Sequence, residues 1–187
     1  MRWIPFILLL YVVLLVQTTL GRVLVFSTNS LGAVGPDLLA ILAVFVALRV
    51  RAGVDAALAG WILGFALDLT VAAGTGSTIV LGPMALSYAL GCWGVYRVRE
   101  ALFRDRMTVQ ALLVFVFCCV VHFIWVTAES LFAGDGTSWS CYGRLLLQAL
   151  ALGAYTAVLA PVGLRGLAAI RGWIVQAPAG RSRRGRR

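Results

Sequence analysis

Lysine is absent from this chain of 187 residues, and histidine occurs only once. A single histidine, His122, excludes a metal site built from several histidines. The four cysteines do not indicate a disulfide framework, because Cys92, Cys118 and Cys119 lie within apolar runs. No serine partner is evident for His122, which we interpret as a hydrogen-bonded core histidine, with a proton relay or a ligand contact as the alternative. We therefore predict a protein that is not an enzyme and needs no cofactor.

Charge of either sign is scarce, whereas apolar residues are abundant. Hydrophobic residues make up 61% of the chain and charged residues 12%, with a mean hydropathy of +0.96. These values are far from those of soluble globular proteins. A helix needs about twenty apolar residues to cross roughly 30 Å of hydrocarbon. The composition predicts an all-α integral membrane protein, and its clear spans are residues 3–20, 54–73, 77–96, 107–132 and 142–164.

A sixth helix is expected over residues 38–48. Eleven residues give only about 17 Å of helix, too little to cross a membrane alone. Pro36 and Asp37 precede this run, and proline at a first helical position beside an acidic residue is a good helix start. We favour a short or partly buried helix, and thus a polytopic bundle of six transmembrane helices, with five as the alternative.

The sequence does not decide where the fourth helix begins or where the last helix ends. The fourth helix begins either near residue 77 or at Pro83, because Gly82 and Pro83 interrupt its start. Pro161 is expected to kink or end the last helix. Residues 1–176 are predicted to form one membrane domain, followed by a disordered arginine-rich tail over residues 177–187.

Arginine placement predicts the orientation. Arg49 and Arg51 flank one connection, and four more arginines lie between residues 97 and 106, whereas the connections 74–76 and 133–141 contain none. Cytoplasmic connections carry the excess of basic residues, so the C-terminus is predicted to be cytoplasmic. With six spans Arg2 is inside and Arg22 outside, and with five spans they exchange sides. The number of arginines on each side is the same in both cases, so the charge bias does not decide the side of the N-terminus. The tail is expected to contact anionic lipids rather than nucleic acid, because no folded basic domain accompanies it.

Acidic residues near the outer ends of the spans are the candidate functional site. Asp68 and Glu129 each lie close to the outer end of a span, and Asp37 opens the short helix from the same side in the six-span arrangement. Arg22 and Arg144 are expected at that level too. A charge inside a membrane is unfavourable by several kcal/mol unless it is paired or hydrated. Structural ion pairing with an arginine and contact with a partner protein or an outward pocket are both open.

Small residues recur every four positions before Asp68. They are Ala52, Ala56, Gly60 and Gly64, and such spacing lets a neighbouring helix approach closely. Packing within the chain is the favoured interpretation, and contact between two copies in a homodimer is the alternative.

The order of these motifs resembles the rod-shape-determining MreD family. Gly35-Pro36-Asp37-Leu38-Leu39, followed by an apolar helix ending in Arg49, resembles the opening signature of that family. Gly60-x-x-x-Gly64-Phe65-x-x-Asp68-Leu69 and the later Ala128-Glu129 match as well, although the Ser-Gly pair that usually follows the aspartate is missing. The residues that carry the resemblance are Pro36, Asp37, Gly60, Gly64, Asp68 and Glu129.

The resemblance implies a scaffold of the elongasome in the bacterial inner membrane. Such proteins bind MreC, a single-span protein, and connect through it to MreB, to RodA and to the transpeptidase partner of RodA, which together organise peptidoglycan synthesis, the cell wall and cell shape. The implied fold is similar to the six-helix S components of ECF vitamin transporters. An actual S component is the alternative, but those proteins dock through alanines spaced four apart in the first helix, and residues 3–20 contain none.

Overall fold

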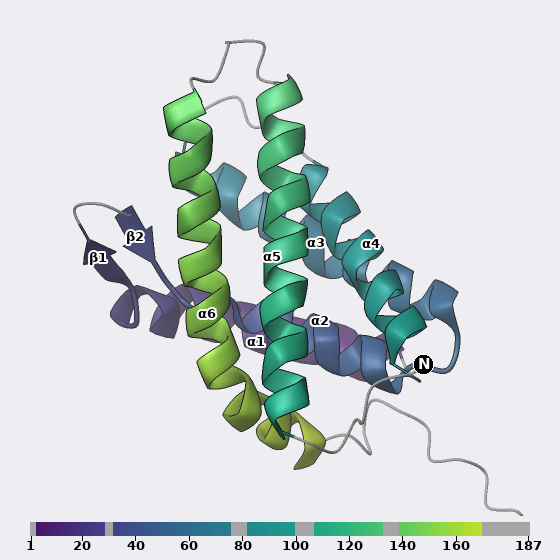
Figure 1. Cartoon of the computed structure of the whole chain (residues 1–187). Helices are drawn as coiled ribbons and strands as arrows, with labels where there is room; N and C mark the ends of the chain where they lie inside the picture. Colours follow the sequence, from purple (N-terminus) through teal and green to yellow (C-terminus); the bar gives the residue numbers. More distant parts are fainter. Residues whose placement is uncertain (1–2, 29–31, 76–81, 100–106, 133–138, 170–187) are drawn as a thin grey trace, which may run out of the picture.

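A computed structural model describes residues 3–28, 32–75, 82–99, 107–132 and 139–169. These residues form six α-helices and one short β-hairpin (Figure 1). In chain order the elements are α1 (Trp3–Val23), β1 (Phe26–Thr28), β2 (Gly32–Val34), α2 (Leu38–Arg49), α3 (Gly53–Thr75), α4 (Pro83–Val98), α5 (Met107–Phe132) and α6 (Trp139–Ala169). The prediction of a helical protein is confirmed.

Helix α2 is the short sixth helix that the sequence predicts. Asp37 is its N-cap, and the carboxylate accepts a 3.1 Å hydrogen bond from the backbone N–H of Ala40. Because Asp37 takes the cap position, Pro36 lies one residue before the helix rather than at its first position. Aspartate at an N-cap supplies an acceptor to the free N–H groups of the first turn.

The start of α4 and the course of α6 at Pro161 can be compared with the sequence prediction. Helix α4 begins at Pro83, the later of the two predicted starts, and residues 76–81 lie outside the described part of the chain. Helix α6 continues through Pro161 to Ala169, so of the two effects expected of Pro161, a kink or a helix end, the helix end is wrong. A proline costs one backbone hydrogen bond, which neighbouring groups can compensate in membrane helices.

Helix α2 lies at the centre of the molecule. All residues from Leu39 to Leu48 are buried, and α2 contacts each of the other five helices. Figure 1 shows α1 and α2 crossing behind the upright pair of α5 and α6. A helix that is apolar on every side is suited to such a position. At 1.5 Å per residue, its 12 residues give a length of about 18 Å.

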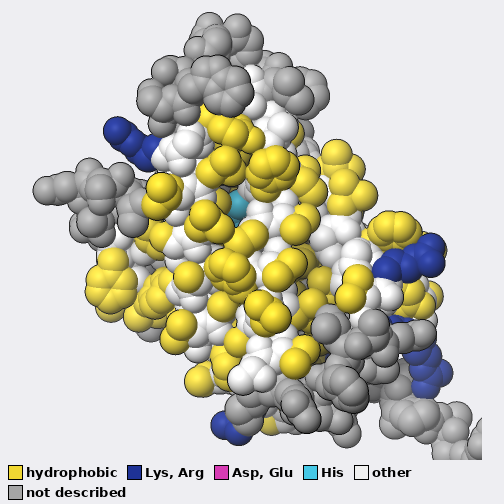
Figure 2. All heavy atoms as spheres, viewed as in Figure 1, with side chains coloured by type: hydrophobic (Ala, Val, Ile, Leu, Met, Phe, Trp, Pro, Cys, Tyr) yellow, Lys and Arg dark blue, Asp and Glu magenta, His cyan; other side chains and the backbone are white. Residues whose placement is uncertain are grey.

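The outer surface is apolar over the long helices. Three helices, α3, α5 and α6, are long and apolar enough to cross a membrane, whereas α1 and α2 contain shorter apolar stretches within the described residues. Hydrophobic side chains cover the face formed by α5 and α6, with arginines at the margins of the view (Figure 2). An apolar surface of this extent is expected of a protein that faces lipid.

A β-hairpin joins α1 to α2 and was not predicted. Its strands pair antiparallel, with Phe26 opposite Val34. The ring of Phe26 meets that of Tyr155 on α6 edge to face, with the centroids 5.9 Å apart. The hairpin therefore lies against α6, beside the end of the molecule where α2 begins (Figure 1).

Candidate functional site

Asp37 joins its own helix to α4. The hydroxyl of Tyr88 donates a hydrogen bond to one carboxylate oxygen of Asp37, while the other oxygen accepts the bond from Ala40. Both side chains are buried, Tyr88 completely. Hydrogen bonds to charged groups are worth about 1.5–3 kcal/mol, so this contact fixes α4 against the start of α2.

Two further bonds tie the start of α2 to the first and last helices. The backbone N–H of Asp37 donates to the hydroxyl of Thr156 on α6 at 3.0 Å, and that hydroxyl donates to the carbonyl of Leu152 at 2.8 Å. The backbone N–H of Leu39 donates to Oε1 of Gln17 on α1 at 3.1 Å. Four helices thus meet through hydrogen bonds around Asp37.

Asp68 performs a similar task for α4. One carboxylate oxygen accepts hydrogen bonds from the backbone N–H groups of Gly82, at 3.0 Å, and Ala85, at 3.2 Å. Gly82 is the N-cap of α4 but offers no side chain, and its φ of +124° is one that glycine adopts readily. Asp68, reaching across from α3, therefore supplies the acceptor that the end of α4 lacks, and its negative charge complements the helix dipole.

The predicted arginine partners do not complete this site. Arg144 is exposed on α6 and forms no ion pair with Asp37 or Asp68 within the described part of the chain. The side chains of Arg22 and Glu129 lie outside the described residues. Ion pairing of Asp68 with Arg144 is thus not found, because backbone amides of α4 hold the carboxylate instead.

The small-residue series packs α3 against α4. A Cβ atom added at Gly64 would lie 2.3 Å from the carbonyl oxygen of Met84, and one at Gly60 would lie 2.5 Å from that of Tyr88. Ala56 is fully buried, whereas Ala52 is exposed just before the helix begins. Gly60 and Gly64 thus serve contact within the chain, the favoured interpretation, and the close approach brings Asp68 to the start of α4.

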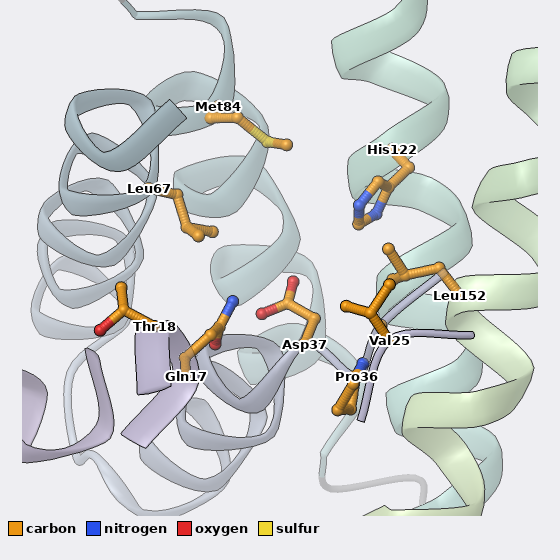
Figure 3. Close-up of a pocket in the computed structure, with 10 residues that line it drawn as sticks. Gln17, Thr18, Val25, Pro36, Asp37, Leu67, Met84, His122 and Leu152 are labelled. Atoms are coloured by element: carbon orange, nitrogen blue, oxygen red, sulfur yellow. The ribbon is translucent and has the colours of Figure 1, made fainter. Parts of the chain in front are cut away.

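A pocket of about 400 Å³ lies beside Asp37. Figure 3 shows its lining side chains converging from several helices, with His122 directed toward Asp37. The pocket is lined by Gln17, Thr18, Val25, Gly35, Pro36, Asp37, Leu67, Met84, His122 and Leu152.

His122 is 7% exposed and has one ring nitrogen engaged. Its Nδ1 lies 2.9 Å from the carbonyl oxygen of Cys118. Since a carbonyl can only accept, Nδ1 is the donor, and in the neutral ring Nε2 is then an acceptor. His122 is a hydrogen-bonded core histidine, as the sequence indicated, although its ring also borders a cavity.

No catalytic or metal-binding arrangement is visible in the described part of the chain. It contains no group of three or more histidine, cysteine, aspartate or glutamate side chains placed to hold a metal ion. Asp37 accepts one hydrogen bond from its own helix and one from Tyr88 of α4, and Asp68 accepts two from the start of α4. Both residues thus cap a helix start and join two helices.

Tyr88, Gln17 and Thr156 belong to the site and were missed from the sequence. Each is a polar residue within an apolar run, which is the available signal, since a buried polar group needs a partner. That signal does not reveal which partner each residue finds.

Comparison of the chain with family models, with curated proteins and with solved structures finds no significant match.

Proposed function

We propose that this chain is a non-enzymatic scaffold of the cell-elongation machinery in the bacterial inner membrane. It binds an MreC-like single-span protein and, through it, connects to MreB, RodA and the transpeptidase partner of RodA. In this role it helps organise peptidoglycan synthesis and cell shape, as the resemblance of its motifs to the MreD family implies.

The main support is that Asp37 and Asp68, two of the three acidic motif residues, hold helices in position. Asp37 accepts hydrogen bonds from Ala40 and Tyr88, and Asp68 accepts them from the first turn of α4. Gly60 and Gly64 allow α3 and α4 to approach within backbone contact. Residues that fix the positions of helices suit a protein that presents a rigid surface to a partner.

The arrangement of the helices supports six spans with both ends of the chain in the cytoplasm. Helix α1 runs antiparallel to α2 (Figure 1), so the N-terminus lies where α2 ends at Arg49. At this same end the hydroxyl of Tyr96 donates to the carbonyl of Arg51 at 3.0 Å, and Arg99 donates to the carbonyl of Val50. Arginines gather on the cytoplasmic side of membrane proteins. A buried α2 surrounded by five helices is compatible with a bundle of the S-component type.

Purification of the tagged full chain from its native membrane in mild detergent tests the proposal. We expect mass spectrometry to find an MreC-like single-span protein in stoichiometric amounts. An unrelated tagged polytopic protein of the same host, purified in parallel, provides the background. Absence of any such partner, with the chain itself folded, would contradict the scaffold role.

The pocket favours one alternative function. A cavity of about 400 Å³ falls within the usual size range of small-molecule sites, as a substrate-binding subunit of a vitamin transporter would require. In that case the same purification would recover ATPase subunits and a bound vitamin instead of an MreC-like protein.

A further inference from the structure

The pocket beside Asp37 has a polar end formed by Gln17, Asp37 and His122. Oε1 of Gln17 accepts from the backbone N–H of Leu39, so the amide N–H groups of Gln17 are donors at this end. An ionised carboxylate offers about four acceptor positions, and the described contacts of Asp37 use one on each oxygen. Nε2 of His122 faces the cavity without a hydrogen-bond partner among the described residues, and its side chain is more than nine-tenths buried. Two acceptors from different helices, α2 and α5, therefore face one space (Figure 3).

The remaining walls are mostly apolar. Val25, Pro36, Leu67, Met84 and Leu152 surround the polar end. Among the described residues that line the pocket, Asp37 is the only acid and none is an arginine. A group that is to displace water from this space must therefore bring hydrogen-bond donors, and a positive charge on it would meet the carboxylate.

We propose that this pocket binds a small amphiphilic amine, with the ammonium group between Asp37 and His122 and the apolar body against Leu67, Met84 and Leu152. The proposal is independent of the scaffold function, because it rests on the lining of this pocket and not on the binding of a partner protein. Nε2 of His122 has no hydrogen-bond partner among the described residues, and such an acceptor is satisfied by water or by a ligand. The cavity volume admits an organic ligand.

The single histidine of the chain makes the test specific. A sample labelled with ¹⁵N only in histidine has one imidazole, so its Nε2 resonance reports this pocket alone. The probe is 2-phenylethylamine, compared with 2-phenylethanol and 3-phenylpropionate, added to the purified full chain in detergent. We expect a saturable shift with the amine, a weaker response with the alcohol and none with the acid.

Two variants separate pocket binding from folding. Leu152→Trp fills the pocket from α6 without removing a polar group, and it should abolish the shift. Leu150→Trp is the matched control, because Leu150 is exposed on the same helix, and it should bind as the unaltered chain does. Asp37→Asn keeps an acceptor for Ala40 and should weaken amine binding roughly tenfold or more, the loss expected from removing a charged hydrogen-bond partner.

The outcomes that would overturn the proposal are defined by the same titrations. Equal affinity for amine and acid would show that the carboxylate does not select the ligand. A saturable shift that survives Leu152→Trp would place the probe elsewhere, and the absence of any saturable response in the folded unaltered chain would show that the pocket takes no such ligand.

Discussion

Asp37 and Asp68 show how one residue type meets the same need in two ways. Asp37 caps the helix that it precedes, whereas Asp68 caps a helix whose N-cap residue, Gly82, lies 14 residues later in the sequence. The free N–H groups of a first helical turn need acceptors when water is absent. A carboxylate provides them, and in both places it also links two helices.

Substitutions of Asp68 separate its hydrogen bonds from its charge. Asp68→Ala removes the acceptor for Gly82 and Ala85, and loss of a cap typically costs about 0.5–2 kcal/mol. Asp68→Asn keeps an oxygen in the same place, so we expect most of the stability and the partner complex to be retained. Thermal unfolding in detergent, followed by co-purification of each variant, measures both effects. If Asn proved as harmful as Ala, the charge itself would be required.

The importance of Asp68 could be predicted from the sequence, but its partners could not. An acid in an apolar run is conspicuous because its burial is unfavourable. Its actual partners are backbone N–H groups of Gly82 and Ala85, and a backbone amide leaves no trace in the residue types. An arginine, a partner protein and an outward pocket were therefore the contacts considered for Asp68, and the start of α4 was not among them. Tyr88 was missed for the related reason that a tyrosine in an apolar run is common.

At the scale of elements, the contact between α3 and α4 depends on glycines that let the two backbones meet. Gly60 and Gly64 face backbone atoms of α4, whereas Gly94, further along α4, faces open space. Dispersion and close backbone approach drive helix association in lipid, where the hydrophobic effect gives no help. Gly60 and Gly64 thus leave no room for a side chain between α3 and α4, whereas Gly94 leaves room for one.

Substituting alanine at these two kinds of position should have unequal effects. Gly64→Ala introduces a Cβ 2.3 Å from the Met84 carbonyl oxygen, so the helices must separate, and we expect a loss of about 1–3 kcal/mol. Gly94→Ala meets no atom within 4 Å and should be neutral or slightly stabilising. Urea-induced unfolding of the two variants in mixed micelles provides the comparison. Equal stability of both would mean that α3 and α4 do not pack through Gly64.

Most elements could be predicted, and the exceptions have physical causes. Apolar runs and a proline–aspartate start were sufficient to predict α2, and the run from residue 107 to 132 became α5 unchanged. The hairpin at Phe26 was missed because its strands have three residues each, too few to show an alternating pattern. The helix end, one of the two effects expected of Pro161, is not found, because neighbouring helices can compensate for a missing N–H that would end a helix in water.

For the whole molecule, the antiparallel packing of α1 and α2 predicts where the chain begins. A membrane-impermeant maleimide applied to spheroplasts tests this with one added cysteine at a time in a Cys141→Ser background. This background keeps Cys92, Cys118 and Cys119 within the apolar helices and serves as the blank. Asp135→Cys should react, since the connection it occupies is predicted to be outside, whereas Arg51→Cys and Arg2→Cys should not. Labelling of Arg2→Cys as strong as that of Asp135→Cys would instead support five spans.

The central position of α2 also has a consequence for biogenesis. Helix α2 is the second helix to leave the ribosome, yet it contacts α6, the last one. Its length of about 18 Å is well below the thickness of the hydrocarbon layer. During synthesis α2 therefore has only α1 beside it until the later helices have been inserted and enclose it. A chain shortened before α6 would lack the Thr156 hydroxyl that accepts the hydrogen bond from the N–H of Asp37, and α2 would be uncovered. Insertion of α6 therefore completes the assembly, and unfinished chains are exposed to membrane quality control.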